Sequence, residues 1–82
     1  MNQDDFNAQI DEQLRVLVVK NMFADAETRV QCVRKVFELA KLVEARNSWS
    51  ARQTATLFKS WLVQIGIDPD AALMLYTAEN LS

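Results

Sequence analysis

The sequence predicts an all-α fold, a compact four-helix bundle that forms a single domain over residues 1–82. One Gly and one Pro in the chain are too few for the many tight turns of a β-sandwich or barrel. Apolar residues recur every three or four positions over long stretches, which is typical of amphipathic helices. With 50% apolar and 24% charged residues, the 82-residue chain has the composition of one small ordered domain rather than of a disordered segment.

The first helix is expected at about residues 5–22. Asp4 or Asp5 can cap it, since a carboxylate accepts hydrogen bonds from the free N–H groups of a helix start. Its core-facing residues are Phe6, Ile10, Leu14 and Leu17. The β-branched residues Val16, Val18 and Val19 would also suit a strand, but no second strand candidate exists to pair with them, so we expect them to be helical.

The second helix, expected at about residues 26–46 behind the cap Asp25, has the clearest pattern. Its apolar half holds Val30, Cys32, Val33, Val36, Phe37, Leu39, Ala40 and Val43. Its polar half holds Gln31, Arg34, Lys35, Glu38, Lys41 and Arg46. Glu38 and Lys41 are spaced for a weak ion pair on the exposed side.

The third helix is expected at residues 51–65, because Ser50 and Gln53 have the spacing of a capping box. We expect it to bury Ala51, Ala55, Phe58, Trp61, Leu62 and Ile65. Gly66 can take the left-handed conformation that ends a helix, and Ile67 can fold back on Leu62 in a Schellman motif.

A fourth helix is expected at about residues 69–80, with Asp68 as the cap and Pro69 in the first helical position. Its residues 71–76 are all apolar, and six consecutive residues cover the full circumference of a helix. Three other helices can hardly cover such a helix completely, so we expect part of it to be covered by another chain. The predicted partner-binding residues are Trp49, Leu73, Met74, Leu75, Tyr76 and Leu81.

Charge is distributed unevenly along the chain. Residues 1–12 carry four acidic groups and residues 66–82 carry three, with no basic residue in either segment. All nine basic residues therefore lie between them, where they meet four acidic residues. This distribution leaves open a basic face that binds nucleic acid through its backbone, formed by Arg34, Lys35, Lys41, Arg46 and Arg52.

The composition argues against independent catalysis. The chain has no His, the commonest general base and metal ligand, and a single Cys32 that cannot form an internal disulfide or a thiolate metal cluster. One Gly excludes a glycine-rich phosphate loop. We therefore expect no catalytic residue, no metal and no cofactor, and we interpret Cys32 as a small core residue.

These features together predict a small cytoplasmic interaction protein, such as an adaptor, a regulatory inhibitor or a subunit. It would bind another protein or a second copy of itself, most simply as a homodimer, through the apolar C-terminal helix. A regulator that binds nucleic acid is the alternative, and a subunit that is active only with its partner stays open. No apolar run approaches the length of a membrane-spanning helix, so no membrane association is expected.

Overall fold

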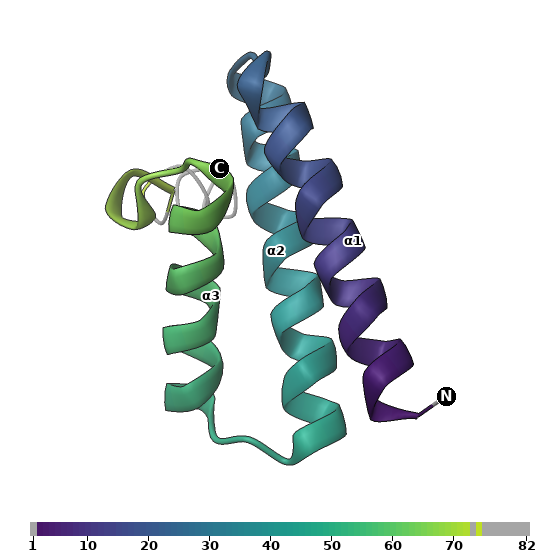
Figure 1. Cartoon of the computed structure of the whole chain (residues 1–82). Helices are drawn as coiled ribbons and strands as arrows, with labels where there is room; N and C mark the ends of the chain where they lie inside the picture. Colours follow the sequence, from purple (N-terminus) through teal and green to yellow (C-terminus); the bar gives the residue numbers. More distant parts are fainter. Residues whose placement is uncertain (1, 73, 75–82) are drawn as a thin grey trace.

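Three long helices form the protein: α1 (Gln3–Met22), α2 (Ala26–Asn47) and α3 (Ala51–Ile65) (Figure 1). The computed structural model describes residues 2–72 and 74 of the chain. Consecutive helices run in opposite directions, and each of the three contacts both others. The all-α prediction is confirmed, and the part of the chain that the structure describes contains no strand.

The expected four-helix bundle is confirmed only in part. Residues 69–72 and 74 are helical, and the Ala72 N–H donates to the Asp68 carbonyl at 2.9 Å, so a fourth helix does begin where the sequence predicts. The rest of that prediction, residue 73 and residues 75–80, lies outside the described residues. Three helices are substantial, and their facing apolar stripes already form one continuous core.

The first helix begins earlier than expected. Asn2 is its cap, with a side-chain oxygen that accepts from the Asp5 N–H at 2.8 Å, so the prediction of Asp4 or Asp5 as the cap was wrong. The two aspartates instead lie in the first turn, where the positive end of the helix dipole favours carboxylates. At α2 the predicted cap is confirmed, because Asp25 accepts from the Thr28 N–H at 2.8 Å.

Both ends of α3 were predicted correctly. The Ser50 hydroxyl accepts from the Gln53 N–H at 3.3 Å and the Gln53 side chain accepts from the Ser50 N–H at 2.9 Å, which completes the capping box. At the other end Gly66 is left-handed, with φ 94°. The Ile67 N–H donates to the Leu62 carbonyl at 2.9 Å, as a Schellman motif requires, and the Ile67 side chain is buried.

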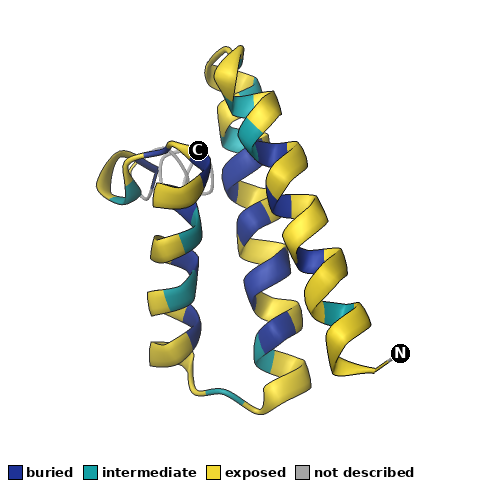
Figure 2. Cartoon of the chain, in the orientation of Figure 1, coloured by how far each residue is buried: buried dark blue, intermediate teal, exposed yellow. Residues whose placement is uncertain are grey.

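The core lies along the facing sides of the three helices, as Figure 2 shows. It contains Ile10, Leu14, Leu17, Cys32, Val33, Val36, Leu39, Ala40, Val43, Phe58, Leu62, Ile65, Ile67 and Ala72. The prediction of the buried face of α3 is wrong at the N-terminal end of the helix, where Ala51 and Ala55 are exposed and Thr54 is buried. Thr54 can be buried there because its hydroxyl donates to the Ser50 carbonyl at 3.1 Å.

Candidate interaction surface

Four large apolar side chains are exposed on the C-terminal half of α1 and just beyond it. We call this group the α1 patch; its members are Val16, Val19, Met22 and Phe23. Phe23 is 87% exposed, the highest value among the large apolar side chains that the structure describes as exposed. Helical residues advance by about 100°, so Val16 and Val19 project from the side of α1 opposite to the core residues Leu14 and Leu17. The patch therefore faces away from the bundle.

Basic side chains lie on both sides of the α1 patch. Arg15 and Lys20 are exposed, and the helical spacing places them on opposite flanks of the line from Val16 to Phe23. Glu12 lies one turn before Val16 on the same face, and the exposed Asp25 follows Phe23 by two residues, so a carboxylate lies near each end of the patch. No ion pair within residues 2–72 involves Arg15, Lys20 or Glu12. The two flanks of the patch are thus basic, whereas acidic side chains lie near its two ends.

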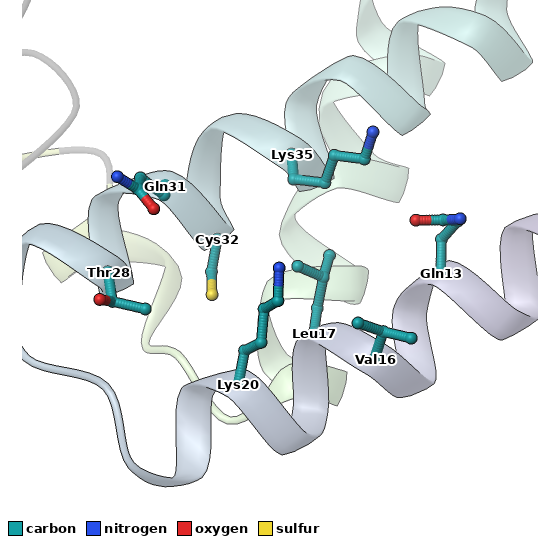
Figure 3. Close-up of a pocket in the computed structure, with 8 residues that line it drawn as sticks. All are labelled: Gln13, Val16, Leu17, Lys20, Thr28, Gln31, Cys32 and Lys35. Atoms are coloured by element: carbon teal, nitrogen blue, oxygen red, sulfur yellow. The ribbon is translucent and has the colours of Figure 1, made fainter.

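A groove between α1 and α2 borders the α1 patch at Val16 (Figure 3). It encloses about 400 Å³ and is lined by Gln13, Val16, Leu17, Lys20, Thr28, Gln31, Cys32 and Lys35. Lys20 points from α1 toward α2, and the Cys32 sulfur points back toward α1. Burial raises the pKa of the Cys32 thiol, an effect that the nearby Lys20 charge partly offsets. The thiol therefore stays protonated at neutral pH, as a core residue rather than a nucleophile.

Of the predicted partner-binding residues, the structure describes Trp49 and Met74. Trp49 is half-buried in the α2–α3 connection and packs against the core, whereas Met74 is 74% exposed. Trp49 precedes α3 and Met74 follows it, so the roughly 22 Å length of that helix separates them. Four further predicted residues, Leu73, Leu75, Tyr76 and Leu81, lie outside the described residues.

The basic residues predicted to face nucleic acid are all exposed. Two of them pair with carboxylates of α2: Lys41 Nζ lies 2.8 Å from Glu44 Oε1, and Lys35 Nζ lies 3.7 Å from Glu38 Oε2. The expected pair of Glu38 with Lys41 is replaced by these two, each at the same i,i+3 spacing. The hydrogen bond from Lys41 is the main reason that the pKa of the Glu44 carboxyl is lowered.

The remaining predicted basic residues, Arg34, Arg46 and Arg52, lie in three different places. Arg46 lies over the Phe6 ring, 4.6 Å from its centroid, and its Nε donates to Gln3 Oε1 at 3.2 Å, so it joins the ends of α1 and α2. Arg34 lies on α2 and Arg52 lies in the first turn of α3. Arg52 borders an open depression beside Trp49. Nucleic-acid binding by these residues stays a prediction.

Residues 2–72 and 74 bear on two of the sequence expectations, those on metal binding and on membrane crossing. Within them, no group of three or more Cys, Asp or Glu side chains is arranged to hold a metal ion. Across the same residues, no helix combines the length and the apolar character that crossing a membrane requires. Comparison of the chain with protein-family models, with curated proteins and with solved structures gave no match. The function must therefore be inferred from the surface of the fold itself.

Proposed function

We propose that this protein is a small helical interaction module that binds another protein chain through the α1 patch. The observation that supports the proposal is the exposure of four large apolar side chains on a face that no other element of the described structure covers. Single exposed apolar side chains are common on protein surfaces, but a contiguous group of this kind is typical of contact sites. Phe23 is the expected centre of the contact, because aromatic side chains dominate the energy of protein interfaces.

The energy of the contact would come mainly from burial of the patch. A large apolar side chain that becomes fully buried contributes about 1.5–3 kcal/mol before the costs of association are subtracted. Val19 and Phe23 lie one turn apart, so a flat or grooved apolar surface can cover both together. The flanking charges of Arg15 and Lys20 would orient the partner rather than supply most of the affinity.

Affinity capture from the native cell, combined with native mass measurement, tests this function. The bait is the full chain, compared with the double variant Val19→Asp/Phe23→Asp. We expect the wild-type bait to retain a bound protein, either a second copy of the chain or a different protein. Free untagged chain should compete with the bait and release that protein. The double variant should lose it, because two carboxylates cannot be buried in an apolar contact without a large cost.

The matched control is Val63→Asp, which introduces a charge at an exposed apolar position of α3 outside the patch. It should retain the bound protein, and circular dichroism should show unchanged helicity for all three chains. Equal capture by wild type and by the patch variant would contradict the proposed function.

A further inference from the structure

We propose that the α1 patch binds the C-terminal segment, residues 68–81, of a second copy of this chain. This inference rests on the proposed function and names the partner of that same surface. Each copy would give its segment to the other and receive one in return, which produces a closed two-fold dimer.

Charge complementarity is the first argument for this occupant. Arg15 and Lys20 flank the patch on both sides. Residues 66–82 carry three acidic side chains, Asp68, Asp70 and Glu79, and no basic one. An acidic segment with an apolar middle is the kind of chain that fits an apolar stripe between two basic side chains. Glu12, at the N-terminal edge of the patch, favours placing the segment over Val16 to Phe23 rather than further back along α1.

The apolar character of the segment is the second argument. Residues 71–76 form an unbroken apolar run, and Met74 is 74% exposed in the single chain. The patch is thus apolar with basic flanks, and the segment is an apolar run between acidic residues, so the one can cover the other.

The placement of the two surfaces favours exchange between copies. Asn21 Nδ2 donates to the Ile65 carbonyl at 3.0 Å, so the end of α3, from which the segment continues, is held at the end of α1 that carries the patch. The patch faces away from the bundle, whereas Ala72 is buried in the core, so the segment of the same chain begins at the core and not at the patch. The patch and the start of the segment therefore lie at the same end of the molecule. A two-fold axis at that end can place the patch of each copy against the segment of the other.

The area is sufficient only when the contact is reciprocal. If each patch side chain offers on the order of 100 Å² and the segment offers as much, two such contacts bury roughly 1,600 Å², the size of a specific interface. A single contact would bury half of that, which is typical of weak or transient association.

A complementation experiment tests the exchange. The patch variant Val19→Asp/Phe23→Asp keeps its segment, and the segment variant Met74→Asp/Tyr76→Asp keeps its patch. In sedimentation velocity we expect wild type to dimerise and each variant alone to be monomeric. Their mixture should form a mixed dimer through one intact contact, at least tenfold weaker than wild type. A segment variant that dimerises like wild type would overturn the proposal, since it would show that patch binds patch.

A peptide-binding assay tests the same contact without the need to detect a weak mixed dimer. A fluorescein-labelled peptide of residues 68–82 should bind the segment variant, whose patch is free, and should bind the patch variant at least tenfold more weakly. Arg15→Glu and Lys20→Glu should each weaken binding about two- to fivefold. Val63→Asp in the segment variant is the control and should bind like its parent. Absence of peptide binding up to millimolar concentration would overturn the proposal.

The outcomes separate this inference from the proposed function. A monomeric wild type that binds the peptide only after its own segment is mutated would show that the segment covers the patch within one chain, which overturns exchange between copies. A monomeric wild type that binds no peptide, yet captures a different protein through Phe23, would overturn the inference and leave the proposed function standing.

Discussion

Asn21 connects the last turn of α1 to the end of α3. Its Nδ2 donates to the Ile65 carbonyl at 3.0 Å, while its Oδ1 is buried without a hydrogen-bond partner among the described residues. Gly66 lies directly against this amide, and a Cβ at position 66 would stand 3.3 Å from Asn21 Nδ2. Position 66 therefore needs glycine for two reasons, the positive φ of 94° and the close approach of Asn21.

Replacing Gly66 by alanine should destabilise the protein by about 1–2 kcal/mol, because a side chain in the left-handed region clashes with its own backbone. Urea denaturation measures the change. Ser48 is the matched control, since it ends α2 with a left-handed φ of 54° but is not glycine. Ser48→Gly should leave stability unchanged or raise it. A Gly66→Ala protein as stable as wild type would contradict this account of the α3 end.

At the scale of single elements, helix ends decide where the chain turns. Asp25, Ser50 and Asp68 each precede a helix and accept hydrogen bonds from its first N–H groups. The same local chemistry explains why these boundaries are readable in the sequence, since a cap and its partner lie within three residues of each other. The start of α1 shows the limit of such reasoning, because Asn2, Asp4 and Asp5 are all good caps and the preference among them is small.

The cap of α2 makes stability depend on pH. The hydrogen bond from the Thr28 N–H lowers the pKa of the Asp25 carboxyl below its ordinary value of 3.8. Because the folded state holds the charged form, this contribution is fully present above pH 3.8 and is lost as pH falls through the lower pKa of the folded protein. Asp25→Asn keeps an acceptor without a charge, so its free energy of unfolding should fall less steeply below about pH 4. Urea titrations between pH 2 and pH 7 test this, and parallel curves would refute it.

At the scale of the whole molecule, three helices share one core, and its centre lies where α3 meets the other two. Leu62 is fully buried there, whereas its neighbour Val63 is exposed. Across the layer between α2 and α3, Phe37 and Phe58 meet edge to face with their ring centroids 5.6 Å apart. A domain of this size is expected to be only marginally stable, so the loss of one central side chain is a large fraction of its total stability.

Leu62→Ala should therefore lower the free energy of unfolding by about 2–5 kcal/mol, through lost burial and the cavity that remains. Val63→Ala changes the next residue on the exposed side and should stay within about 0.5 kcal/mol of wild type. Chemical denaturation followed by circular dichroism measures both. Similar losses from the two substitutions would mean that the core does not lie where the structure places it.

The sequence was informative wherever a signal is local or periodic. The spacing of Ile10, Leu14 and Leu17 located the buried face of α1, and Gly66 followed by Ile67 located the end of α3. The predicted bounds of α1, α2 and α3 were accurate within two residues for the same reason. Sequence reasoning missed the α1 patch, although Val16 and Val19 lie off the core stripe and could have indicated it. Their β-branched side chains indicate a conflict between helix and strand propensity, which obscures the second apolar face.

By itself the sequence determined the all-α class, the approximate bounds of the three long helices and the caps Asp25 and Ser50, because hydrogen bonding at helix ends and apolar periodicity act within a few residues. Only the tertiary structure decided that Thr54 is buried while Ala51 and Ala55 are exposed, and that the α1 patch remains uncovered. Which side of a helix meets a neighbour depends on the rotation and position of that neighbour. Those are set by how the three stripes pack together, and no single stripe encodes them.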